Sequence, residues 1–469
     1  MPPNILWYDF ETSGTDPVLD RALQFAAVRT DTNLDVLEAP VNILCRPGDD
    51  CIPDPEAIAV TGISMNQVVQ EGLSEFAFCK KILDTIMVPE TCVAGYNSIR
   101  FDDEFLRQML YRNFFEPYTR EWQGGNSRWD IIDLVRTAYA LRPDGVNWPR
   151  DDEGTVTFRL EKLTAANGID HGHAHDAVAD VLATIAMAKR IREAQPRLYD
   201  YLYNLRQKRA VVDLLYPLGK TPLVHISSMY PAARGCAALV LPLCQHPTNN
   251  NGVVCVDLSA DPAPLIAASP DEINRLLYIR NDDLAEGETR MPLKTIHVNR
   301  CPALATARTL SADRAVELGI DLDACERNKV RLQQTAGLVE RVTAALDRPH
   351  PGRDEDADFM LYGGGFLSRD DIALMSDVRD TEGLDLPALF GRFQDDRMNT
   401  LLPRFQARNW PASLDAAALA EWRAFWRDRS SARLQENLAR IAAMPDDTVT
   451  PAIDDLAGYL ESLNARMAT

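Results

Sequence analysis

The hydrophobic pattern of residues 1–195 alternates between short apolar runs and longer stretches with helical spacing. Apolar runs that end at polar or glycine-containing turns predict strands at residues 5–10, 22–29, 41–45 and 91–96. Apolar side chains at intervals of three and four predict helices at residues 75–87, 102–114 and 174–194. Three strands followed by alternating strands and helices favour an α/β domain with a mixed sheet and helices packed against it.

The pattern changes after Gln195 and Pro196. Short apolar bursts separated by proline and asparagine clusters, as at residues 237–243 and 253–258, predict a small β-rich domain. Residues 348–358 are polar, acidic and proline-containing, which is typical of a linker. Helical spacing follows at residues 415–444 and 451–467. We therefore expect three domains, at residues 1–195, 196–347 and 353–469.

The composition narrows the class of protein. Of 469 residues, 46% are hydrophobic and 25% are charged, as in ordinary globular proteins with several cores. No apolar run is long enough to cross a membrane, and the first residues lack the pattern of a secretory signal. The nine cysteines form no C-x-x-C pair, so neither a zinc site nor a disulfide framework is indicated. Unpatterned thiols fit a reducing, cytoplasmic location.

The formal net charge of −20 argues at first against a nucleic-acid partner, because phosphate binding usually requires a basic surface. The acidic excess is uneven, however. Residues 201–350 carry nearly equal numbers of basic and acidic side chains, whereas the segments on either side are strongly acidic. This distribution is compatible with a local cationic surface in the middle of the chain.

The first chemical motif is Asp9-Phe10-Glu11, at the end of the first predicted strand. Residues two apart on a strand point to the same side, here the side of Ile5 and Trp7. Two neighbouring carboxylates repel each other unless a cation lies between them, and divalent metals prefer carboxylate oxygens. The alternative is a solvated turn, which is the more common explanation for an isolated D-x-E pair.

Two further motifs follow along the chain. Asn97 comes directly after a predicted strand, and Asp102 opens a predicted helix, where capping of the helix N-terminus is an alternative to a catalytic role. His175 and Asp180 lie at the start of the helix predicted for residues 174–194. The neighbouring His171 and His173 are expected to be solvated loop residues rather than ligands.

Taken together, D-x-E, N-x-x-x-F-D and H-x-x-x-x-D occur in the order of the three motifs of the DEDDh exonucleases. The chain therefore resembles that superfamily. It further resembles its bacterial exonuclease I family along essentially its whole length, in segments at residues 18–25, 126–130, 140–149, 158–169, 222–225 and 407–411.

The resemblance implies a metal-dependent hydrolase. Asp9, Glu11, Asp102 and Asp180 would hold two Mg²⁺ ions, for which Mn²⁺ could substitute, and His175 would act as the general base. Two metals can stabilise the attacking and the leaving oxygen of a phosphodiester, and the ordinary pKa of histidine suits proton transfer near neutral pH. The implied activity is processive 3′-to-5′ hydrolysis of single-stranded DNA to 5′-mononucleotides, in DNA repair and recombination.

The fold implied by the resemblance is an RNase H-like exonuclease domain, an SH3-like β domain and a C-terminal helical domain around a groove for the strand. Aromatic stacking and a cationic track serve sequence-independent strand binding. The candidates for strand binding are Asn97, Trp122, Arg128, Arg159 and Lys220. A surface ion pair is the alternative for each arginine. Gly219-Lys220-Thr221 is not a P-loop, because Leu214 replaces the first glycine.

The family also binds the acidic C-terminal tail of single-stranded DNA-binding protein, and Arg142 and Tyr201 are the candidate contacts. The chain departs from the family pattern at Ser311 and Gln333, where basic residues are expected. Nearby arginines that could compensate are Arg308, Arg314, Arg327 and Arg331.

Two alternatives remain open. The first is a DEDDh exonuclease that trims RNA 3′ ends or acts as a proofreading activity. Such enzymes are mostly near the size of residues 1–195, so the long second half argues against it. The second is a non-catalytic nucleic-acid-binding protein, against which the five intact catalytic positions argue. Family precedent suggests a monomer.

Overall fold

The computed structural model describes residues 3–172, 176–348, 356–445 and 448–468. The chain divides into two compact units. The first unit comprises Met1–Ser127, His171–Leu182 and Gly352–Thr469, and the second comprises Arg128–Asp170 and Ala183–Pro351. The N-terminal sheet and the C-terminal helices therefore belong to the same compact unit.

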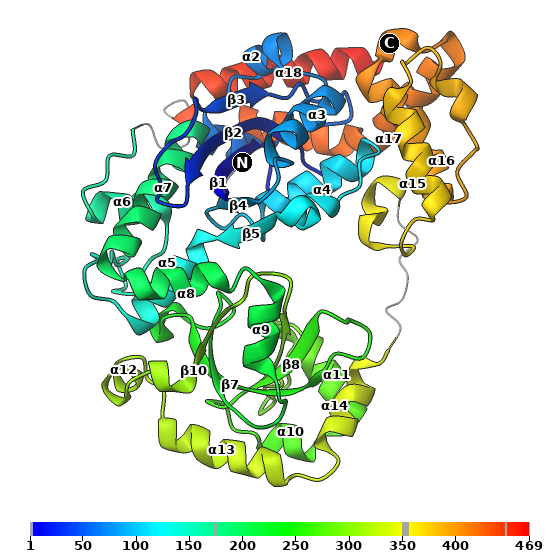
Figure 1. Ribbon diagram of the computed structural model, residues 1–469. Helices are drawn as coiled ribbons and strands as arrows, with labels where there is room; N and C mark the ends of the chain where they lie inside the picture. The colour runs from blue at the N-terminus through cyan, green and yellow to red at the C-terminus, as the bar shows by residue number, and fades with distance from the viewer. Residues whose placement is uncertain (1–2, 173–175, 349–355, 446–447, 469) are drawn as a thin grey trace. The chain divides into compact units, whose positions relative to one another are not determined.

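A mixed five-stranded sheet begins in the first unit, with the order β3-β2-β1-β4-β5 (Figure 1). β1 pairs antiparallel with β2 and parallel with β4. This confirms the predicted mixed sheet and its four predicted strands. The fifth strand was not predicted, since it is only four residues long and contains Ser127 and Arg128. The strands are β1 (Asn4–Thr12), β2 (Ala22–Asp31), β3 (Val41–Leu44), β4 (Thr91–Gly95) and β5 (Ser127–Asp130).

One face of β1 forms the centre of an aromatic core. Tyr8 and Phe10 are buried and pack with Phe25 of β2 and with Phe78 of α3 (Glu75–Ile86). Because side chains alternate along a strand, Asp9 and Glu11 point away from this core. Burial of the aromatic face therefore fixes the register that places both carboxylates on the opposite face.

Helices of the first unit come from both ends of the chain, and they confirm the helices predicted at 75–87, 102–114, 415–444 and 451–467. The apolar faces of α1 and α2 pack with those of α17 and α18 in one buried cluster. The helices are α1 (Pro55–Thr61), α2 (Met65–Glu71), α3 (Glu75–Ile86), α4 (Asp102–Arg112), α7 (Ala177–Ala194, which continues into the second unit), α15 (Arg369–Asp380), α16 (Asp396–Asn409), α17 (Ala416–Ala442) and α18 (Pro451–Ala468).

The second unit contains an antiparallel sheet with the order β10-β6-β7-β8-β9, which confirms the β-rich middle region. Its strands are β6 (Leu223–Ile226), β7 (Ala237–Gln245), β8 (Gly252–Asp257), β9 (Leu293–His297) and β10 (Ala303–Thr306). Its helices are α5 (Ile131–Leu141), α6 (Leu160–Ala166), α8 (Pro196–Asn204), α9 (Lys208–Leu215), α10 (Ala263–Ala267), α11 (Pro270–Tyr278), α12 (Ala312–Glu317), α13 (Leu322–Gln334) and α14 (Leu338–Leu346).

Two general properties follow from these elements. Within the described parts of the chain, no helix combines the length and the apolar character needed to cross a membrane. All nine cysteines are free thiols, and every one except Cys301 is buried.

Candidate active site

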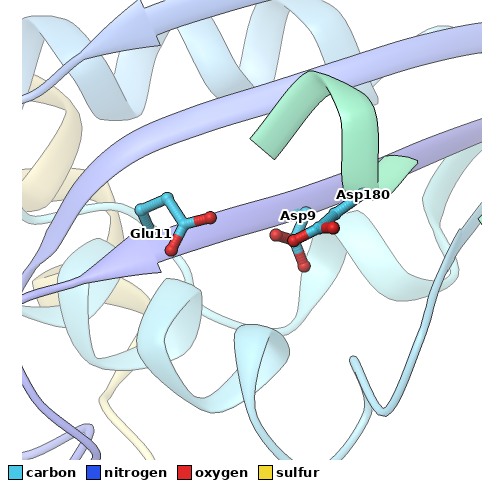
Figure 2. Close-up of side chains that lie close together, drawn as sticks. All are labelled: Asp9, Glu11 and Asp180. Atoms are coloured by element: carbon cyan, nitrogen blue, oxygen red, sulfur yellow. The ribbon is translucent and has the colours of Figure 1, made fainter. Parts of the chain in front are cut away.

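Three carboxylates from two elements meet in the first unit. β1 contributes Asp9 and Glu11, and the first turn of α7 contributes Asp180. One carboxylate oxygen from each residue lies within 4.8 Å of the others. Figure 2 shows Asp9 and Asp180 directly beside each other, with Glu11 farther along the same strand. The spacing of the D-x-E motif thus produces a clustered acidic site rather than a solvated turn.

The electrostatics of this group are unfavourable without a cation. Burial raises the pKa of Asp9 above its ordinary value, and the negative charge of Asp180 raises it further. Burial also raises the pKa of Glu11, with Asp9, Asp180 and Asp176 adding to the shift. The neighbouring charges that act on both groups are therefore all carboxylates. Hard oxygen donors with uncompensated negative charge fit a divalent metal ion.

Asp102 approaches the same strand from the start of α4. Its side chain is 2% exposed, and Oδ1 accepts a hydrogen bond of 3.0 Å from the backbone N–H of Phe10, between Asp9 and Glu11. Burial raises the pKa of Asp102, and the charge of Asp9 adds to this shift. The capping alternative is wrong, because the N-cap residue of α4 is Phe101 and the Asp102 carboxylate binds β1 instead.

A neighbouring carboxylate, Asp103, was missed by sequence reasoning. Its Oδ1 accepts hydrogen bonds of 2.7 Å from the Tyr8 hydroxyl and from the Arg120 guanidinium, and all three residues are buried. These contacts join α4 to β1 directly behind the acidic site. The doubled aspartate after Phe101 was the available signal, but only the fold reveals that the two residues have different partners.

The histidine-rich loop before α7 also differs from expectation. The side chain of His171 is only 12% exposed, and its Nε2 lies 2.5 Å from Oδ1 of Asp180. The prediction that His171 is solvated is therefore wrong, since its imidazole packs against the Asp180 carboxylate on the first turn of α7. His173 and the predicted general base, His175, lie outside the described residues.

The two strand-binding candidates of the first unit are not members of the carboxylate group. Asn97 follows β4 in a left-handed backbone conformation, with φ of 64°. Trp122 lies between two short 3₁₀ segments, and its side chain is 65% exposed. An indole with this exposure is available for stacking on a base.

The strand-binding candidates of the second unit differ in how far their side chains are exposed to solvent. Arg128 lies in β5, is buried and donates a hydrogen bond of 3.1 Å to the Asn299 carbonyl. Arg159, at the N-cap of α6, and Lys220 are both exposed. Sequence reasoning could not separate these cases, because burial of an arginine depends on distant segments.

The candidate contacts for an acidic tail also lie in the second unit. Arg142 is exposed and donates a hydrogen bond of 3.0 Å to the Thr309 carbonyl. Burial raises the pKa of the half-buried Tyr201. Of the departures from the family pattern, Ser311 caps α12, and Gln333 donates a hydrogen bond of 2.8 Å to the Gly219 carbonyl.

Comparison with known proteins covers almost the whole chain. Residues 6–188 match the exonuclease family, residues 206–348 the exonuclease I SH3-like domain and residues 355–462 the exonuclease I C-terminal domain. Exodeoxyribonuclease I of Escherichia coli K12 is 45% identical over 418 residues, which are 89% of this chain and 88% of that protein.

Solved structures give the same result. E. coli exonuclease I in complex with a dA16 oligonucleotide matches with a TM-score of 0.92 and 42% identity, over 98% of this chain and 100% of that chain. The zinc-bound form of the E. coli exonuclease I complex with single-stranded DNA matches with a TM-score of 0.92 and 40% identity, over 100% of both chains. On this sequence identity and coverage, the chain belongs to the exonuclease I family.

Proposed function

We propose that this protein is a metal-dependent exodeoxyribonuclease that hydrolyses single-stranded DNA from its 3′ end and releases 5′-mononucleotides. The carboxylate group of Asp9, Glu11 and Asp180 carries this proposal, because it brings together three hard oxygen donors, and among the described residues the charges that raise the pKa values of Asp9 and Glu11 are those of other carboxylates. Membership of the exonuclease I family supports the reaction, and the relatives in complex with oligonucleotides support the substrate.

The donor set fits two Mg²⁺ ions, with Mn²⁺ as a substitute. Asp9, Glu11 and Asp180 would hold one ion, and Asp102 would act at the second with Asp9 as the shared ligand. When bound, the ions would stabilise negative charge on the attacking and leaving oxygens of the phosphodiester. A zinc-bound relative supports divalent metal binding in the family, whereas the choice of Mg²⁺ is part of the proposal.

The chain's own residues have separate tasks in this mechanism. His175 would take the proton from the attacking water, since its ordinary pKa is near the working pH. The contact between His171 and Asp180 would orient that carboxylate. The bond from the Phe10 N–H to Asp102 would hold the strand and α4 at a constant separation. The contacts of His171 and Asp102 exist before substrate binds.

Strand binding is proposed for Asn97, Trp122, Arg128, Arg159 and Lys220. Trp122 offers a stacking surface, and the exposed Arg159 and Lys220 offer charge for phosphates. Arg128 would need to exchange its bond to the Asn299 carbonyl for a phosphate oxygen. Sequence-independent contacts of this kind are compatible with processive digestion.

We further propose that a monomer binds the acidic C-terminal tail of single-stranded DNA-binding protein in the cytoplasm, through Arg142 and Tyr201. The exposed guanidinium of Arg142 can pair with a carboxylate of the tail. Fluorescence anisotropy with a labelled tail peptide tests this contact, and Arg142→Ala should weaken binding without changing hydrolysis of naked DNA.

The decisive experiment is a degradation assay on 5′-labelled single-stranded DNA, with matched RNA and duplex substrates, in Mg²⁺ and in EDTA. We expect metal-dependent shortening from the 3′ end that is fastest on single-stranded DNA. Asp9→Asn should be inactive, whereas Asp84→Asn, which changes an exposed carboxylate on α3, should be fully active. Preference for RNA would instead support a 3′-end trimming enzyme, and activity in EDTA would refute the metal mechanism.

A further inference from the structure

The loop that follows the acidic strand is closed by its own hydrogen bonds. The backbone N–H of Ser13 donates to the Arg21 carbonyl over 2.8 Å, and the N–H of Arg21 donates to Ser13 Oγ over 2.9 Å. The Thr12 hydroxyl donates to the Gly14 carbonyl over 2.7 Å. Residues 13–21 therefore form an ordered connection between β1 and β2, and it starts two residues after Glu11.

The register between β1 and β2 shifts where this loop begins, beside the acidic site. Glu11 pairs with Gln24, but the next residue, Thr12, pairs with Ala22. The extra residue is Leu23 of β2, so β2 bends beside Glu11 and Thr12. The regular pairing of Glu11 with Gln24 therefore ends at an irregularity that the 13–21 loop closes.

Asp20 holds the loop in place from inside. It is 3% exposed, and its Oδ2 accepts a hydrogen bond of 2.9 Å from the Asp16 N–H. The carboxylate also lies directly against Gly14, since a Cβ atom on that glycine would be 2.2 Å from Asp20 Oδ2. The Asp20 carboxylate therefore packs on the backbone three residues from Glu11.

The other oxygen of Asp20 is held by the C-terminal part of the chain. Arg433 of α17 donates from Nη2 to Asp20 Oδ1 over 2.5 Å, across 413 residues of sequence. Removing the cation from a buried ion pair is strongly destabilising, because it leaves the carboxylate buried without a compensating charge. Arg433 therefore stabilises the buried Asp20 carboxylate in its position against Gly14.

We infer that Arg433 is a positioning residue for the metal site: through Asp20 it fixes the 13–21 loop and thereby the direction of the Glu11 carboxylate. The inference rests on the proposed function for the role of Glu11. It assigns the C-terminal helices a part in shaping the acidic site, in addition to their packing on α1 and α2.

The chain offers a matched control on the same helix. Arg440 of α17 also forms an ion pair with a carboxylate of the N-terminal segment, over 2.9 Å to Asp54 Oδ2. The Asp54 carboxylate caps α1, and the contact of Asp54 with the 13–21 loop is made by its backbone N–H, which donates to the Ser13 carbonyl over 2.7 Å. Arg433→Met and Arg440→Met therefore remove the same kind of ion pair, but only the first removes a partner of a loop side chain, whereas the second leaves the backbone bond from Asp54 to Ser13 in place.

The test measures Mn²⁺ binding by isothermal titration calorimetry, kcat and KM on single-stranded DNA, and melting temperature, all with the full chain. Residues that orient metal ligands typically affect metal affinity or activity by about 10–100-fold. For Arg433→Met we expect the lower end, about tenfold weaker Mn²⁺ binding and about tenfold lower kcat, with KM unchanged. Arg433→Lys should recover most of both values, and Arg440→Met should keep both.

The inference is overturned if Arg433→Met retains wild-type Mn²⁺ affinity and kcat, or if Arg440→Met loses as much of either as Arg433→Met does. Asp20→Asn provides a second route, because it should reproduce Arg433→Met and the double variant should be no worse than either single variant. A wild-type protein that binds Mn²⁺ without cutting DNA would refute the proposed function alone, since the Mn²⁺ affinities of the variants still decide the role of Arg433.

Discussion

Two groups of buried carboxylates lie in the first unit, and they have opposite environments. In the acidic site, burial and neighbouring carboxylates raise the pKa values of Asp9 and Glu11. In the second group, burial also acts to raise the pKa values of Asp50 and Asp358, but arginines outweigh it and hold both values well below the ordinary range. Among the described residues, the same residue type thus faces other carboxylates in one place and arginines in the other.

The paired group connects distant parts of the chain. Arg408 of α16 binds Asp50 over 2.7 Å and Asp358 over 2.8 Å. Arg404 and Arg429 also reach Asp358, over 2.8 and 2.7 Å. The comparison teaches a simple distinction: carboxylates with arginines supplied by the fold hold segments together, whereas carboxylates without them form a site for an added cation.

The two groups of carboxylates should differ most in how far their substitution lowers enzymatic activity. Asp9→Asn should lower hydrolysis of single-stranded DNA by about a thousandfold or more, because stabilisation of the transition state by metal ions is worth several kcal/mol. Asp50→Asn should remain active at temperatures where it is folded. Initial rates of nucleotide release measure both. Activity of Asp9→Asn within tenfold of the wild type would break the distinction.

For stability, the substitution in the arginine-paired group should have the larger effect and the substitution in the acidic site the smaller one. Asp358→Asn leaves three arginines with less compensation and should lower the free energy of unfolding by about 3 kcal/mol. Asp9→Asn should cost little or stabilise the metal-free protein, since it removes a carboxyl group whose ionisation is opposed by burial and by the charge of Asp180. Urea unfolding in EDTA gives both values. Asp49→Asn, which removes a surface pair with Arg466, is the control and should have no measurable effect.

The pH dependence should differ in sign between the groups. Asp50 and Asp358 have lowered pKa values in the folded state, so their contribution is present above the unfolded pKa of about 4 and is lost as pH falls below it. Asp9 and Glu11 have raised values, so metal-free stability should fall as pH rises through the neutral range.

Melting temperatures measured across pH in EDTA test these slopes. The acid slope should be shallower in Asp358→Asn, and the decline toward alkaline pH should be shallower in Asp9→Asn. Identical profiles for the wild type and both variants would show that neither group controls stability.

The smallest expected effect concerns His171. His171→Ala removes the contact with Asp180 and should weaken Mn²⁺ binding by about tenfold at most. His171→Asn keeps a side-chain donor and should bind closer to the wild type. Calorimetric titration compares the three proteins, and an unchanged affinity in His171→Ala would show that the contact does not orient the metal ligand.

Local pattern determined much of this protein. The apolar run of β1, the alternation that places Asp9 and Glu11 on one face, and the helical spacing of α3, α4, α17 and α18 all depend on residues close in sequence. The three acidic motifs and their order likewise identified the exonuclease family, because each motif is a short contiguous segment of the sequence. Asp102 was found in this way, but its bond to the Phe10 N–H was not.

Tertiary structure decided which charges are paired. Asp20 meets Arg433, Asp358 meets Arg408, and Tyr8 meets Asp103 only after helices from distant parts of the chain pack on the sheet. Hydrophobic periodicity specifies which face of each element is buried, but it does not specify which charged residue of another element arrives beside it. For this reason the acidic motifs could be predicted from the sequence, whereas the arginines that neutralise Asp50 and Asp358 could not.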